Sequence, residues 1–331
     1  MIAEIATVGD CDKVIADLLA AHKSASDEED SFLWKCTDRE QWFGIWFRGE
    51  PDEPNTRLEP SVFRPIPSTT PSTVRYFEEQ SVYNYARNRV LQTRDTPCDL
   101  FTSLTYLQHY GTPTRLLDWT EGMLVALYFA VKDLDRTRDG WLYCLNSRKL
   151  NKRTGMKEGW VNIHDDASFG TLFRAEFVVC ERRSEWFHNV ASYSKFRWED
   201  VAKYRSESKY YLTTGVPERA LDDHCEPVAV LPRFRTTRQQ MQRTAFTLHG
   251  GKRYSENRLA EVRSEDRIPE PVSLYELNKN LADREKFLLE FRIPAASKEL
   301  IRKQLLLYGI HEGTLFPDSD LLGMHVKEMF S

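Results

Sequence analysis

Four residues of the stretch QHYGTPTRLLDW carry side chains that can bind a ligand or take part in catalysis. His109, Thr114, Arg115 and Asp118 fall within ten positions, and the glycine and proline between them favour a turn. His109 could serve as an acid or base or donate a hydrogen bond, and Arg115 could grip an anion through its planar guanidinium. A site and a purely structural turn are equally open interpretations of this pair.

Asp118 has a second interpretation, because Asp118-Trp-Thr-Glu121 has the spacing of a capping box. The apolar positions from Leu124 to Leu134 recur at helical spacing directly after it. We therefore expect Asp118 to cap a helix. Thr114 and Arg115 would lie just ahead of the N-terminus of that helix, which favours anions.

A second arginine lies in the stretch WFRGE. Trp42 to Phe47 read as a strand, so Arg48 would stand at its end beside Gly49. An arginine there can fork onto a phosphate or carboxylate, and a glycine lets a ligand approach the backbone. Taken alone, three residues favour an ordinary surface arginine before a turn.

Two further polar groups favour structural interpretations. Arg238 and Gln242 would stand one turn apart on a helix, where a solvated face is favoured over a cleft. Asp318 and Asp320 have a spacing that can bind a metal, but no third ligand is evident, so capping of the last helix is favoured. We expect no metal site.

Composition narrows the class of protein. The 331 residues carry a net charge of -4 and are 41% apolar, enough for a sizeable core and too balanced for a global attraction to nucleic acid. No apolar run is long enough to span a membrane, and no signal peptide is evident, so we expect a cytoplasmic protein without a membrane partner. Six dispersed cysteines indicate free thiols. Glycine-rich phosphate loops, HExxH and GxSxG are missing from the sequence.

The elements that would position these residues mix without a βαβ rhythm. We predict helices over 10–24, 73–92 and the segment after Ser297, which ends at Gly309, and strands at 140–146, 228–231, 245–249 and 287–293. The fold class predicted is α+β: a mixed, mainly antiparallel sheet with flanking helices. Residues 1–30 would form an N-terminal helix and acidic loop, and 31–325 one domain with an irregular insertion at 147–225.

The blocks taken together resemble the FRG domain family. The resemblance rests on FRG at 47–49, LQHYGTPTRLLDWT at 107–120 followed by LVALYFAV, QRTAFTLHG at 242–250, and FRIP from 291 with TLFPD ending at 318. It implies kinship of fold more than a chemistry, since fold alone does not fix function.

A weaker resemblance links Phe47-Arg48-Gly49-Glu50 to ADP-ribosyltransferase toxins. It implies that Arg48 holds the phosphates of NAD, used as a substrate, and that His109 and Tyr110 contact its ribose or nicotinamide. Glu290 or Asp318 would be the late acidic residue. The protein would then be a bacterial toxin or phage-defence effector that modifies a protein or nucleic acid.

The alternative is a non-catalytic module that binds a nucleotide or nucleic acid, with Arg48, Arg64 and Arg115 as phosphate contacts. In either case Gly49, Gln108 and Thr114 would help to bind the ligand. Both hypotheses predict that Arg48, His109, Arg115 and Asp118 surround one pocket.

Overall fold

The computed structural model describes residues 3–24, 32–33, 44–52, 58–66, 74–77, 82, 100–133, 137–153, 161–162, 226–232, 236–261 and 270–317. Eight strands in these ranges form one sheet in the order β1-β8-β4-β2-β3-β7-β6-β5. The strands are β1 (Ala3–Glu4), β2 (Ile45–Glu50), β3 (Leu116–Thr120), β4 (Gly140–Asn146), β5 (Val161–Asn162), β6 (Val228–Leu231), β7 (Thr244–Leu248) and β8 (Leu288–Ile293). The outermost pairs, β1 with β8 and β5 with β6, are parallel, and the other five pairings are antiparallel. The predicted mixed, mainly antiparallel α+β fold is confirmed.

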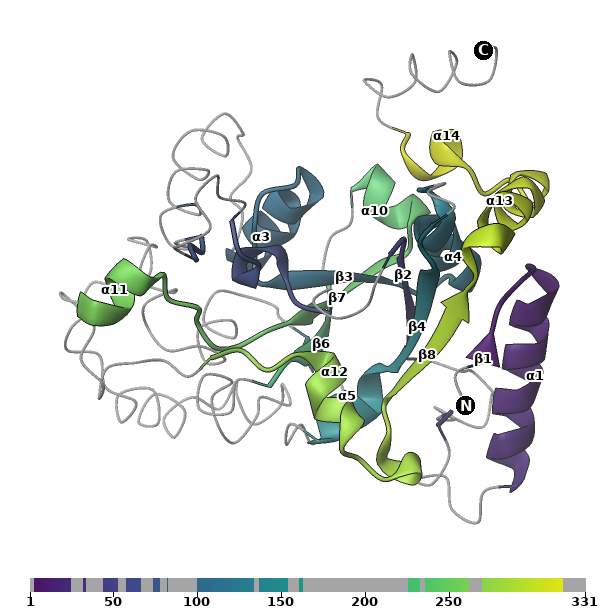
Figure 1. Ribbon diagram of the computed structural model, residues 1–331, viewed down its shortest axis with the longest axis horizontal. Coiled ribbons are helices and arrows are strands. Elements are labelled where there is room, and N and C mark those ends of the chain that lie inside the picture. The colour runs from purple at the N-terminus through teal and green to yellow at the C-terminus, as the bar shows by residue number, and fades with distance from the viewer. Residues whose placement is uncertain are drawn as a thin grey trace.

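Helices surround this sheet (Figure 1). They are α1 (Gly9–Ser24), α3 (Leu100–His109), α4 (Met123–Val131), α5 (Ser147–Arg153), α10 (Thr237–Met241), α11 (Glu256–Glu261), α12 (Leu274–Lys279), α13 (Lys298–Leu307) and α14 (Glu312–Leu315). Short 3-10 turns cover Ser61–Phe63, Asp283–Glu285 and Ala295–Ser297.

The sheet has a weak joint in its middle. β2 pairs with β4 along its whole length, from Ile45 to Glu50, but with β3 only at Phe47 and Thr120. β3 pairs instead with β7 over five residues. The two halves therefore diverge, and in Figure 1 β3 and β7 run across the view while β4 and β8 run down it.

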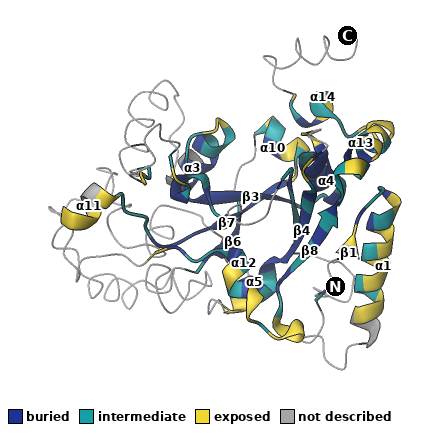
Figure 2. Ribbon diagram, in the orientation of Figure 1, coloured by how far each residue is buried: buried dark blue, intermediate teal, exposed yellow. Residues whose placement is uncertain are grey.

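Alternation along the strands builds a core on each face of the sheet. In β4, Leu142 and Cys144 pack into a cluster with α1, α4 and α13, whereas Tyr143 and Leu145 pack into a second cluster with α5 and α12. Successive side chains of a strand point to opposite faces, so β4 contributes to both cores. Figure 2 shows the buried residues concentrated on the central strands and α4.

Helix α4 is apolar on all sides because it is buried. Seven of its nine residues are buried, and it lies so close to β2 that a Cβ atom on Gly49 would be 1.8 Å from the Ala126 carbonyl oxygen. Such a contact is impossible for a side chain, so the lack of one at Gly49 lets this helix pack closely on β2.

Several predicted elements are confirmed. The helix over 10–24 is α1, and the strand at 140–146 is β4. The late strands lie within one residue of the predicted bounds and belong to the same sheet as β2. Gly309 ends the last long helix with φ 74°, the left-handed conformation typical of a helix C-terminus. Cys11 and Cys144 are free thiols, both buried.

Other predictions are wrong. Asp118 caps no helix: it lies in the middle of β3, and α4 begins later, after Gly122. Thr114 and Arg115 therefore precede a strand. Of the predicted helix over 73–92, residues 74–77 are not helical, residue 82 is helical, and the others lie outside the described residues.

The remaining differences concern boundaries. Arg48 lies within β2 and not beyond its end, since the strand runs to Glu50. Ser297 precedes α13 as predicted but makes no capping hydrogen bond through its side chain. Of the predicted insertion at 147–225, only α5 and β5 fall among the described residues. β1 pairs with β8, so the N-terminal segment shares the main sheet.

Candidate functional site

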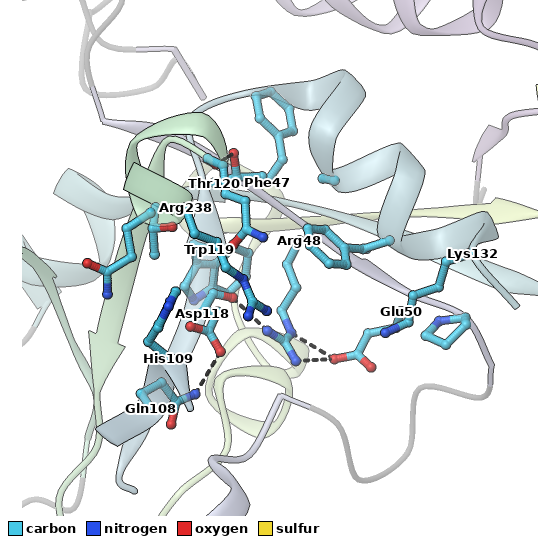
Figure 3. A pocket seen from close by; sticks show the side chains of 17 residues that line it. Phe47, Arg48, Glu50, Gln108, His109, Asp118, Trp119, Thr120, Lys132 and Arg238 are labelled. Carbon is cyan, nitrogen blue, oxygen red and sulfur yellow. Dashed lines mark hydrogen bonds and ion pairs between the residues drawn. The ribbon is translucent and has the colours of Figure 1, made fainter. Parts of the chain in front are cut away.

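A cavity of about 360 Å³ opens where β2 and β3 diverge (Figure 3). Its walls come from β2, the end of α3, β3, α4, and α10 with the residues that follow it. The residues that line it are Phe47, Arg48, Gly49, Glu50, Pro51, Gln108, His109, Asp118, Trp119, Thr120, Ala126, Phe129, Lys132, Arg238, Gln239, Gln242 and Thr244. This size is within the range of small-molecule sites.

Arg48 crosses the gap between the two strands. Its Nε and Nη2 donate to Glu50 Oε1, each at 2.7 Å, and its Nη1 donates to the Asp118 carbonyl oxygen at 2.6 Å. Beyond Phe47, β2 and β3 are no longer paired, and here the Arg48 guanidinium donates to the β3 backbone in place of a β2 N–H group. Glu50 is buried, and this ion pair orients the arginine toward the cavity.

The carboxyl group of Asp118 faces the same cavity. Its Oδ2 accepts a hydrogen bond from Gln108 Nε2 at 2.7 Å. Burial raises the pKa of Asp118 above its usual value, and Arg48, the Gln108 amide and Arg238 act in the opposite direction. A carboxyl group with a raised pKa among cations is a common feature of functional sites.

Two further cations, Arg238 and Lys132, line the cavity, and each makes a cation–π contact with an aromatic ring. The Arg238 guanidinium carbon lies 4.4 Å from the centre of the Phe316 ring, and Lys132 Nζ lies 5.7 Å from that of Phe129. The two rings meet edge to face at 6.0 Å. Gln242, which follows α10, connects this side of the cavity to α14, since its Nε2 donates to the Leu315 carbonyl oxygen at 3.1 Å.

Residues 44–139 match the family model of the FRG domain. The chain contains an FRG domain. The match runs from the start of β2 to the turn before β4, and it includes the cavity residues from Phe47 to Lys132. Arg238, Gln239, Gln242 and Thr244 lie outside it, so the cavity is completed by a later part of the chain. No curated protein and no solved structure matches the sequence.

Of the predicted site residues, the FRG domain brings Arg48, Gly49, Gln108 and His109 to the cavity, together with Asp118. Gly49 lies there for a different reason from the one predicted, because its open side faces α4 and not a ligand. The His109 ring packs edge-on against Tyr110 at 4.7 Å. Tyr110 itself is exposed and does not line the cavity.

The other two predicted arginines serve the structure. Arg115 is buried and donates to the His249 carbonyl at 3.1 Å, which ties the start of β3 to the end of β7. Arg64 donates twice to the Glu59 carbonyl, at 3.0 and 2.8 Å. Neither lines the cavity, so only three of the four residues expected around one pocket are there.

Thr114 is buried beside the cavity, and its hydroxyl contacts Gln108 rather than open space. Glu290 lies on β8, opposite Tyr143 in register, and does not line the cavity. Burial raises its pKa. Asp318 falls outside the described residues. In the part of the chain that is described, no cluster of three or more acidic, histidine or cysteine side chains could hold a metal.

The sequence analysis did not predict that α10 and the residue after it form a wall of the cavity. Arg238 and Gln242 were assigned to a solvated helix face, and that interpretation is wrong, because both line the cavity. α10 is only five residues long, so its apolar spacing carries no signal. The signal that was available is the capping box of Thr236 and Gln239, which fixes where this short helix begins. Within the described ranges, no helix is long and apolar enough to cross a membrane.

Proposed function

We propose that the cavity binds NAD and that the protein cleaves it at the bond between nicotinamide and ribose, as an ADP-ribosyltransferase-like enzyme. One observation carries the proposal: three cations, Arg48, Lys132 and Arg238, line the same cavity as the carboxyl group of Asp118. Guanidinium and ammonium groups suit the two phosphates of a dinucleotide. A carboxylate suits the positive charge that develops on the ribose.

The chemistry requires nothing beyond NAD and a nucleophile. The C1′–N bond breaks, and its electron pair leaves with nicotinamide. An oxygen of water or of an acceptor then bonds to C1′ and loses its proton to solvent. Asp118 takes the role that the resemblance assigned to Glu290 or Asp318, since Glu290 does not line the cavity and Asp318 lies outside the described residues. An enzyme that consumes NAD would act in the cytoplasm as a toxin or phage-defence effector.

The test is release of nicotinamide from labelled NAD by the purified protein. Protein, RNA, DNA and water are each offered as the acceptor. Arg48→Lys keeps the charge but loses the planar fork that bonds Glu50 and Asp118 together. We expect a loss of about 10- to 100-fold in nicotinamide release, the effect of one charged hydrogen bond or two.

Arg292→Lys is the matched control. Arg292 is also a strand arginine, and it pairs with two carboxylates, Asp139 and Glu4, but does not line the cavity. It should behave as the wild type. A growth test accompanies the assay: expression of the wild type should slow bacterial growth, and Arg48→Lys should relieve it. Wild-type protein that leaves NAD intact with every acceptor would overturn the enzyme proposal.

The second candidate is a nucleotide-binding module without catalysis. It is favoured by the commitment of Arg48, three of whose N–H groups already bond to Glu50 and to the Asp118 carbonyl. Such an arginine can hold a phosphate while contributing little to a reaction. Tight binding of NAD or ADP-ribose without nicotinamide release, lost in Arg48→Lys, would select this candidate.

A further inference from the structure

A chain of hydrogen bonds leads from the backbone to the carboxyl group of Asp118. The Leu116 N–H donates to Thr114 Oγ1 at 3.2 Å, and Thr114 Oγ1 donates to Gln108 Oε1 at 2.6 Å. Gln108 Nε2 then donates to Asp118 Oδ2 at 2.7 Å. The chain joins the end of α3 to β3 across the turn that contains Thr114.

These bonds fix the orientation of the amide. A threonine hydroxyl has one hydrogen, and here it goes to the oxygen of Gln108. In this arrangement the amide oxygen faces Thr114, and the NH₂ group faces Asp118. Because that NH₂ can only donate, Asp118 Oδ2 is the acceptor in this bond. Oδ1 is therefore the oxygen that this bond leaves uncommitted for a ligand or a proton.

We propose that Gln108 and Thr114 are positioning residues that hold Asp118 with Oδ1 as its reactive oxygen, turned to the ribose of the bound nucleotide. The inference rests on the proposed function for the identity of that ligand. It replaces the roles predicted for Gln108 and Thr114, which were direct contacts with the ligand. Asp118 is the catalytic residue, and the other two act through it.

The charges around Asp118 set the direction of its pH dependence. The charged and titratable side chains that share the cavity with it are Arg48 and Glu50 from β2, His109 from α3, Lys132 beyond α4 and Arg238 from α10. Burial raises the pKa of Asp118, and the Gln108 hydrogen bond opposes that rise. The active form is the carboxylate, so activity should fall as the pH drops through this pKa. Loss of the Gln108 bond should move that fall to higher pH.

The experiment uses the full chain and three variants. Gln108→Met keeps the shape of the side chain without its polar atoms, Thr114→Val removes the hydroxyl, and Thr114→Ser retains it. The matched control is Thr7→Val, which removes a threonine hydroxyl that donates to another carboxylate, Asp10 Oδ2, at 2.9 Å outside the cavity. Two quantities are measured against pH: nicotinamide release, and the carbon NMR shift of the Asp118 carboxyl, assigned by its disappearance in Asp118→Asn.

We expect Gln108→Met to raise the pKa of Asp118 and move the acidic limb of the activity profile upward by about one pH unit, the effect of a hydrogen bond to a charged group. Thr114→Val should shift both quantities in the same direction. Thr114→Ser and Thr7→Val should leave the Asp118 titration and the activity profile at their wild-type positions. A role confined to stability would lower the activity without moving either pH profile.

The outcomes separate this inference from the proposed function. If Gln108→Met and Thr114→Val leave the carboxyl titration unchanged, the positioning proposal is overturned, whatever NAD does. If the titration moves but the activity limb does not, Asp118 is not the reacting carboxyl, and the proposal is overturned for that reason. If the wild type releases no nicotinamide, the proposed function fails, while a shifted titration still supports the positioning of Asp118 by Gln108 and Thr114.

Discussion

Gly49→Ala tests whether the glycine of the FRG stretch serves packing or ligand access. An added Cβ would lie 1.8 Å from the Ala126 carbonyl oxygen and 2.6 Å from the Ala130 nitrogen, whereas side-chain carbons keep at least 3.0 Å from such atoms. Both neighbours are backbone atoms of α4, so no rotamer change can relieve the contact. The helix would have to move away from β2 by about 1 Å, and its buried residues would lose their close packing.

Overpacking of this kind costs about 1–3 kcal/mol, and a clash with backbone belongs at the upper end. For a chain of 331 residues, which unfolds with an entropy of about 2.1 cal/mol/K per residue, about 3 kcal/mol corresponds to a fall of about 4 °C in melting temperature. The measurement is a thermal melt, followed by circular dichroism and calorimetry. Gly9→Ala is the control, because its nearest neighbour is Thr7 Oγ1 at 3.7 Å, an ordinary contact. A Gly49→Ala protein that melts like the wild type, yet no longer binds NAD, would refute the packing argument and restore the ligand-access interpretation.

Three other changes test one side chain beside the cavity and two that support the fold elsewhere. Asn278→Ala should destabilise the fold by about 3 kcal/mol in urea unfolding, since the buried Asn278 bonds three backbone groups of 287 and 288; an unchanged midpoint would contradict this. Phe316→Leu removes the ring beneath Arg238 and should weaken ADP-ribose binding several-fold by calorimetry, with equal affinity as the contrary result. The Lys13 and Thr7 hydrogen bonds lower the pKa of Asp10 to about 2, so its contribution to stability is present above the ordinary value of 3.8 and is lost as pH falls toward 2. Asp10→Asn should flatten that part of the stability profile, and a profile unchanged from wild type would exclude this carboxylate as the cause.

The sequence predicts most helices and strands correctly but does not predict the junction between β2 and β3 where the cavity lies. Strands such as β4 and β8 can be predicted from alternation and from their β-branched or aromatic residues. Helices α1 and α13 can be predicted from the helical spacing of their apolar residues, because all of these signals are local. Asp118 shows where local signals fail. Its capping-box spacing is real, but five residues of β3 pair with β7, more than 120 positions later in the chain. A long-range pairing of this kind overrides a local preference and leaves no trace near Asp118.

Only part of the cavity lining could be predicted, because local motifs indicate some of its residues and long-range strand pairing brings in the others. Arg48, Gln108 and His109 belong to two compact motifs, so their residue types and spacing could be recognised together. Arg238 and Gln242 reach the cavity only because α10 leads into β7, and β7 pairs with β3. Gln242 begins the QRTAFTLHG block, but that block does not indicate which of its side chains enter a cavity. Their role depends on the sheet order, which no local pattern contains.

The diverging strands explain why four consecutive residues of β2 have such different environments. Phe47 makes the one pairing with β3 and packs toward the α4 core, and Gly49, two positions on, must accept the backbone of that helix. Arg48 and Glu50 alternate with them, and there the ladder to β3 has ended. An arginine at 48 can therefore bond the β3 backbone with one edge and Glu50 with another, which holds the gap open as a lined cavity. In this cavity Gly49 allows α4 to pack closely, Arg48 bridges β2 and β3, and Glu50 orients the arginine. A change at any of these three residues should therefore alter ligand binding. Of the three, only a change at Gly49 acts through the packing of α4.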